Sequence, residues 1–191
     1  MNTPFHVAVL VGSLRKGSYT RMIAKEAMRL APSPLALEIV EIGNLPLYNQ
    51  DLDDERHPPA EWVAFRDHIR PMDAVLFATP EYNRSIPGVL KNAIDVGSRP
   101  YGSSVWDGKP AAVISVSPGA IGGFAANNHI RQSMVFLNMP PMQVEAYIGN
   151  VSKLLDSNGS LTSDTTRQFL RTTMESFAAW IERNVRAPAH A

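Results

Sequence analysis

One loop of the sequence, residues 12–20, has the residue types that bind anions. It carries three hydroxyls, a guanidinium and a phenol, supplied by Ser13, Ser18, Thr20, Arg15 and Tyr19. A terminal phosphate has nearly two negative charges, and hydroxyls, a guanidinium and the N–H groups of a helix N-terminus match it. The spacing differs from both the G-x-G-x-x-G and the G-x-x-x-x-G-K-[ST] phosphate loops. A serine-capped helix with a solvated arginine explains the same residues equally well.

A second loop, residues 79–88, suits a flat aromatic group. Two prolines and Gly88 make it stiff, and Tyr82 and Asn83 bring an amphipathic ring and an amide. Backbone N–H groups of such a loop can face the edge of a heteroaromatic ring, while Tyr82 or Pro80 lies against its plane. The alternative is a proline-shaped turn with Tyr82 partly buried.

A third loop, residues 115–123, contains Ser117 and three glycines, of which Gly119 is the first. Glycines allow a ligand to approach the backbone closely. A glycine-rich turn between a strand and a helix is weak support by itself, and a flexible connection is the alternative.

The elements around these loops indicate an α/β fold. Short apolar runs alternate with segments of helical periodicity, which is typical of a parallel sheet. We expect strands over 6–11, 35–42, 73–78, 111–117 and 143–148. We expect helices over 18–30, about 62–69, 87–96, a segment ending near 136, and 162–185. The second strand is the least apolar and is expected near a sheet edge, and residues 43–59 are expected to form a loop.

Two apolar groups bear on packing. The last helix is expected to turn Phe169, Thr173, Phe177, Trp180 and Ile181 inward. A second group follows the preceding helix, at Met134, Phe136, Leu137 and Met139. Core packing is the default interpretation of this second group, and a subunit contact over the ligand is the alternative.

The three loops follow strands expected to be central, so all three open on one rim of the sheet. One loop suits a phosphate, one a planar ring and one a close backbone approach. Flavin mononucleotide (FMN) makes those three demands together, so the sequence predicts an FMN site at this rim.

Composition narrows the function classes. Basic and acidic residues both number 18, so the net charge is zero. A nucleic-acid-binding protein usually has an excess of basic residues, and an electron carrier that docks by charge usually has an excess of one sign. The balanced charge therefore disfavours both classes. The sequence has no cysteine, which excludes disulfides, thiolate catalysis and iron–sulfur clusters. Redox chemistry would therefore need a bound organic cofactor.

Location and domain count follow from length and hydropathy. The first apolar run, residues 7–11, is too short for a signal peptide, and no stretch reaches the roughly 18 apolar residues of a membrane span. We expect a cytoplasmic single domain over 1–191, with an ordered core of about 5–186 and a frayed tail. The five histidines show no helical metal-site spacing, and no metal is expected.

The chain resembles the NADPH-dependent FMN reductase family, which includes quinone, chromate and azo reductases. The likeness covers about residues 6–185. It rests on Gly12-Ser-Leu-Arg-x-x-Ser, Pro80-Glu-Tyr-Asn-x-Ser-x-Pro-Gly, Leu90-Lys-Asn-Ala-Ile-Asp, Ser98-Arg-Pro and Ser117-Pro-Gly-x-Ile-Gly-Gly. The resemblance implies a flavodoxin-like three-layer sandwich whose five-stranded parallel sheet has the order 2-1-3-4-5.

The resemblance also implies one FMN per subunit and a homodimer or homotetramer. The phosphate group would be held by Ser13, Arg15, Ser18 and Thr20, with Tyr19 in the same loop. The ribityl chain and ring would be framed by Pro80, Glu81, Tyr82 and Asn83, with Arg84 at the edge and Ser117 and Gly119 on the other side. Family members often have Asn at the position of Thr20 and Trp at that of Val96.

The implied activity is hydride transfer from NADPH or NADH through FMN to a small acceptor such as a quinone, free flavin, azo compound or chromate, with no catalytic side chain. Ping-pong kinetics are expected. Arg84 and Arg99 are candidates to attract the adenosine phosphate of NADPH or an anionic acceptor, although solvated or interface arginines are the favoured interpretation. A flavodoxin-type electron carrier is the alternative function. A response-regulator-like domain would need acidic residues where Val11, Gly12 and Ser13 stand.

Overall fold

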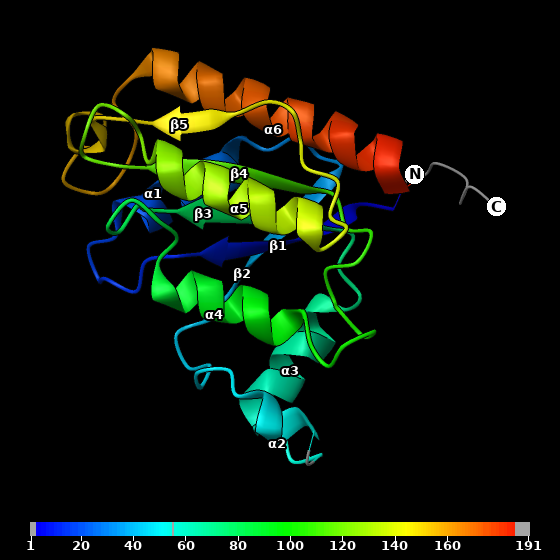
Figure 1. The fold of residues 1–191 in the computed structure, drawn as a ribbon. Helices are drawn as coiled ribbons and strands as arrows, with labels where there is room; N and C mark the ends of the chain where they lie inside the picture. The colour runs from blue at the N-terminus through cyan, green and yellow to red at the C-terminus, as the bar shows by residue number, and fades with distance from the viewer. Residues whose placement is uncertain (1–2, 55, 186–191) are drawn as a thin grey trace.

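The computed structural model describes residues 3–54 and 56–185, and they form one five-stranded sheet with helices on both faces (Figure 1). The strands are β1 (Phe5–Val11), β2 (Leu35–Val40), β3 (Ala74–Thr79), β4 (Ala111–Val116) and β5 (Ala146–Ile148). Their order is β2-β1-β3-β4-β5, and every neighbouring pair is parallel. The predicted fold class and strand order are confirmed.

The helices make the two outer layers. They are α1 (Tyr19–Leu30), α2 (Gln50–Asp54), α3 (Ala60–Ile69), α4 (Gly88–Gly97), α5 (Phe124–Phe136) and α6 (Asp164–Val185), with a 3₁₀ turn at Val151–Lys153. One apolar cluster packs α1 and α6 on the first face of the sheet. A second cluster packs α3, α4 and α5 on the other face. A helix that covers a sheet on one side needs a single apolar stripe, and α1 shows it through Ile23, Ala24 and Ala27.

The central strands are buried on both faces. All six residues of β3 and all six of β4 are buried, as expected for parallel strands between two helical layers. β2 mixes buried and half-buried residues and lies at the sheet edge, as its sequence predicts. The core therefore holds β1, β3 and β4 rigidly, and these are the strands from which the three loops emerge.

Several predicted boundaries need correction. β2 and β5 are shorter than expected, and the supposed loop 43–59 contains α2. Within α6, Thr173, Phe177 and Ile181 are buried, but Phe169 is 38% exposed and Leu170 takes the inward position. The expected frayed tail lies outside the described residues. In the described part of the chain, no helix has the length and apolarity to cross a membrane.

Candidate functional site

The first loop runs from β1 into α1 and turns several polar groups toward the helix N-terminus. Ser13, Ser18 and Thr20 are buried as residues, while Tyr19 is half-buried against the core. Ser18 is the N-cap: its Oγ accepts a hydrogen bond from the N–H of Arg21 at 3.1 Å. That contact uses an acceptor lone pair, so the Ser18 O–H remains a donor. The interpretation of Ser18 as a helix cap is correct, and the same hydroxyl can still donate a hydrogen bond to a phosphate.

The charge of this loop is positive and unpaired. Among the described residues, the Arg15 side chain has no ion pair or hydrogen bond, and Arg15 is exposed. The first turn of α1 has no acidic residue. A helix N-terminus carries about half a positive charge, which adds to that of Arg15. The loop therefore has hydroxyl donors, backbone N–H groups and a free guanidinium in one place.

The second loop forms a tight turn at the end of β3. The N–H of Tyr82 donates to the carbonyl of Ser85 at 3.1 Å, and the N–H of Ser85 donates back to the carbonyl of Tyr82 at 3.0 Å. Asn83 and Arg84 between them have φ of +51° and +63°. Two consecutive non-glycine residues in the left-handed region carry backbone strain, which is often found at functional sites. Tyr82 is 45% exposed, so its ring is available at the rim.

The third loop is fastened to the segment that follows β5. The N–H of Ser117 donates to the carbonyl of Ile148 at 2.9 Å, and the carbonyl of Ser117 accepts from Val151 at 3.2 Å. Inside the loop, the N–H of Gly119 donates to Ser117 Oγ at 3.0 Å. Gly122 and Gly123 have positive φ and give the chain the bend that leads into α5. The glycine-rich turn is therefore held in place and is not a loose connection.

Direct contacts tie the second loop to the first loop and to the helix that follows the third. A Cβ placed on Gly12 would lie 3.2 Å from Cδ of Pro80, so the first loop packs against the second without room for a side chain. The Glu81 carboxylate of the second loop accepts hydrogen bonds from the first turn of α5, directly after the third loop. The second loop is thus packed against the first loop and hydrogen-bonded to the start of α5.

These residues suit FMN. The donor hydroxyls and the unpaired Arg15 match its phosphate, and the close packing at Gly12 brings that loop next to the stiff turn at Tyr82. Gly119 is exposed, and a Cβ there would contact Ser117 Oγ at 3.5 Å, so the backbone is open to a ligand. The predicted residues of all three loops lie at the carboxyl ends of β1, β3 and β4, as a nucleotide in this class of sheet requires.

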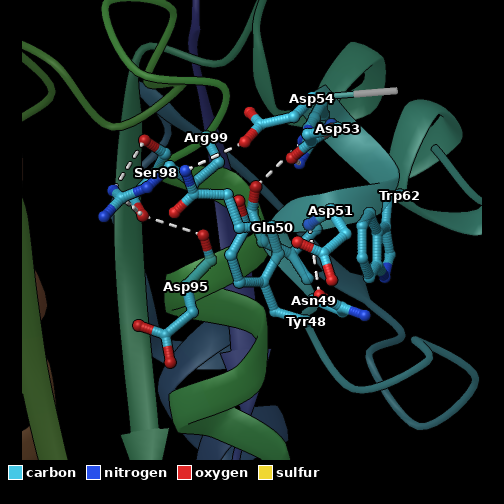
Figure 2. A network of polar contacts seen from close by, with 12 residues as sticks. Tyr48, Asn49, Gln50, Asp51, Asp53, Asp54, Trp62, Asp95, Ser98 and Arg99 are labelled. Atoms are coloured by element: carbon cyan, nitrogen blue, oxygen red, sulfur yellow. Dashed lines mark hydrogen bonds and ion pairs between the residues drawn. The ribbon is translucent and has the colours of Figure 1, made fainter. Parts of the chain in front are cut away.

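Arg84 and Arg99 lie at different ends of α4. Arg84 is in the second loop, where its guanidinium lies 3.4 Å from Glu81 and is largely exposed. Arg99 follows the far end of α4 and donates to the carbonyl and Oγ of Ser98. Figure 2 shows it beside Ser98, near Tyr48 and Gln50. Within one chain, Arg99 is therefore remote from the rim that carries the three loops.

Sequence reasoning missed Asn92, a buried residue of α4. Its Oδ1 accepts from the N–H of Tyr48 at 2.8 Å, and its Nδ2 donates to the carbonyls of Leu45 and Pro46. The side chain thus fixes the loop after β2. An amide on the buried face of an apolar helix is the signal that identifies such a residue, because a buried amide needs partners.

A tyrosine beside the third loop has a perturbed pKa. Burial raises the pKa of the Tyr147 hydroxyl, and the neighbouring Glu145 carboxylate raises it further. The Tyr147 backbone and Cβ would meet a Cβ placed on Gly122, and the Tyr147 ring lies 5.5 Å from that of Phe124, directly after the loop. At neutral pH the phenol stays protonated and adds no charge to the rim.

A hollow of about 740 Å³ lies between the end of β2 and α3, and its lining residue Gly43 packs against Leu14 of the first loop. Its lining includes Val40, Leu45 and Phe65. It lacks the hydroxyl-and-guanidinium set of the first loop. The donor chemistry, and not the size of a hollow, therefore locates the candidate site.

Known proteins resemble the chain over nearly its whole length. A sequence profile described as NADPH-dependent FMN reductase matches residues 5–153. A quinone reductase of Pseudomonas putida is 61% identical over 96% of this chain and 98% of its own. A 2-hydroxy-1,4-benzoquinone reductase of a Burkholderia species is 47% identical over 92% of this chain and 95% of its own. The solved structure of FerB, a flavoenzyme NAD(P)H:(acceptor) oxidoreductase from Paracoccus denitrificans, superimposes with a TM-score of 0.87 at 42% identity, covering 94% and 98% of the two chains.

Proposed function

The chain belongs to the NADPH-dependent FMN reductase family, and from that premise we propose that it oxidises NAD(P)H through bound FMN and reduces a quinone. The proposal rests on three strand-end loops at one rim of the sheet, where the second loop packs on the first and hydrogen-bonds to the start of α5. The first loop adds an unpaired Arg15 beside donor hydroxyls. The relatives with 61% and 47% identity are a quinone reductase and a 2-hydroxy-1,4-benzoquinone reductase, which supports a quinone as the acceptor in preference to chromate or an azo compound.

The proposed binding roles follow the three loops. Ser13, Arg15, Ser18 and Thr20 would hold the phosphate by donating to its oxygens, with Tyr19 packing beneath them. Pro80, Tyr82 and Asn83 would lie along the ring, and Ser117 and Gly119 would bound its other side. Thr20 still donates through its hydroxyl, but it lacks the amide N–H donors of the asparagine that family members often have at this position.

Bound FMN would supply the chemistry for hydride transfer between the nicotinamide and the acceptor. The chain then has to bind and orient the nicotinamide and the acceptor and to exclude water. It needs no side chain that acts as a general base. The overall balance is NAD(P)H plus a proton plus quinone, giving NAD(P)⁺ plus hydroquinone. Arg84, exposed at the rim, would attract the phosphate groups of NAD(P)H, since guanidinium pairs well with phosphate.

Anaerobic addition of NADPH to the FMN-loaded protein tests the activity. We expect bleaching of the flavin absorbance, and its recovery when benzoquinone is added. Steady-state double-reciprocal plots should give parallel lines, because donor and acceptor occupy one place in turn. A flavin that binds but stays oxidised in NADPH would instead indicate an electron carrier.

We also propose that the chain works as a homodimer. Phe136 at the end of α5 is 84% exposed and Tyr101, beyond α4, is 91% exposed, while Met134 and Met139 are buried. The apolar group around residue 136 is therefore part core and part surface. Phe136 borders a hollow between α4 and α5 that a second copy could fill. We further propose that the chain is a single domain with an ordered core of about residues 5–186. It would oxidise NAD(P)H in the cytoplasm.

A further inference from the structure

Helix α5 begins without a cap from its own sequence. Its N-cap is Gly123, which has no side chain to accept a hydrogen bond, and its first turn has no acidic residue. The first N–H groups of any helix lack partners within the helix. A Ser, Thr, Asp or Asn at this position normally satisfies one of them and stabilises the helix.

Glu81 supplies this cap from a distant part of the chain. Its Oε2 accepts hydrogen bonds from the N–H of Ala125 at 2.8 Å and from that of Ala126 at 3.2 Å. The Glu81 side chain is 13% exposed, so water competes little with these bonds. A carboxylate at a helix N-terminus also interacts favourably with the helix dipole. This carboxylate is therefore occupied by α5.

A second contact parallels the first. Ser85 Oγ lies 3.0 Å from Nδ1 of His129, one turn further along α5. The two contacts bracket the strained turn at Asn83 and Arg84. The second loop is thus fastened to α5 before and after its turn, and the third loop leads directly into the same helix.

We propose that Glu81 is a positioning residue: its carboxylate clamps the second loop onto α5, and so fixes the spacing of the two loops that flank the flavin ring. The inference rests on the proposed function. It assigns the Glu81 side chain to the clamp and leaves its backbone to border the ligand. Glu81 acts through Pro80, Tyr82 and the third loop.

The variants Glu81→Ala and Glu81→Gln separate the clamp from general stability. The amide oxygen of glutamine can accept the same two hydrogen bonds, whereas alanine cannot. Glu38→Ala is the matched control, because Glu38 is an exposed carboxylate on β2 that pairs with His68. Each variant is prepared as apoprotein, and FMN binding is measured by quenching of flavin fluorescence.

For Glu81→Ala we expect FMN to bind at least about tenfold more weakly, because a charge-assisted bond that orders the site is lost. Glu81→Gln should recover most of that affinity, and Glu38→Ala should bind as the unsubstituted protein does. Hydrogen exchange of the Ala125 and Ala126 amides should be faster in Glu81→Ala and near normal in Glu81→Gln. If Glu81→Ala does not fold, faster exchange or weaker FMN binding in Glu81→Asp, whose side chain is one methylene shorter, supports the clamp.

Unchanged FMN affinity in folded Glu81→Ala, or unchanged exchange at Ala125 and Ala126, would overturn the clamp. If Glu81→Asp is the variant that folds, the clamp is overturned when it matches the unsubstituted protein in both measurements. Failure of the unsubstituted protein to bind FMN at all would instead overturn the proposed function, so the two failures are distinguishable.

Discussion

At the scale of single residues, phosphate recognition depends on Arg15. Its guanidinium is exposed on the first loop, without a partner in the described part of the chain. We predict that Arg15→Ala weakens FMN binding by about 1.5–3 kcal/mol, the usual range for a hydrogen bond to a charged group. Titration of apoprotein with FMN measures this. Lys16→Ala removes a neighbouring charge and is the control; equal losses in both variants would mean that Arg15 contributes charge and no specific bond.

Arg84 offers a stability test at the same scale. With φ of +63° it occupies a position that glycine adopts without strain, directly after Asn83 at +51°. Arg84→Gly should raise the free energy of unfolding by about 0.5–1 kcal/mol, because relief of strain outweighs loss of the exposed contact with Glu81. Urea denaturation of the apoprotein is the measurement. A lower unfolding free energy would show that the turn is not strained.

At the scale of elements, α4 packs on Trp106 through Gly97. A Cβ at Gly97 would lie 2.3 Å from the buried indole ring, whereas a Cβ at Gly88, at the start of the same helix, meets nothing within 4 Å. Gly97→Ala should therefore destabilise the fold by about 1–3 kcal/mol despite the better helix propensity of alanine. Gly88→Ala should be neutral or slightly stabilising. Thermal or urea unfolding of both variants measures the difference. Equal stabilities of Gly97→Ala and Gly88→Ala would contradict the close packing at Gly97.

The same scale shows what could be predicted from sequence and what could not. β1, β3 and β4 were predictable because buried parallel strands leave continuous apolar runs. α2 was missed because none of its five residues is buried, so it shows no amphipathic period. The clamp at Glu81 was missed because its partners are backbone N–H groups 44 and 45 residues away, which leave no trace in residue type. The prediction that Phe169 points inward was wrong, because the neighbouring Leu170 is buried in its place.

At the scale of the whole molecule, the proposed dimer depends on the exposed Phe136. We predict that Phe136→Glu shifts sedimentation from dimer toward monomer, while the monomer keeps its fold because this side chain is 84% exposed. Val63→Glu, which changes an exposed valine of α3, serves as the control. A dimer unaffected by Phe136→Glu, or a monomeric unsubstituted protein, would contradict the proposed interface.

Uptake of FMN by the apoprotein tests most directly whether the three loops form one flavin site. Titration followed by absorbance and flavin fluorescence should saturate at one FMN per chain, and riboflavin, which lacks the phosphate, should bind more weakly. A protein that remains colourless in excess FMN would contradict the site, and the proposed oxidation of NAD(P)H with it.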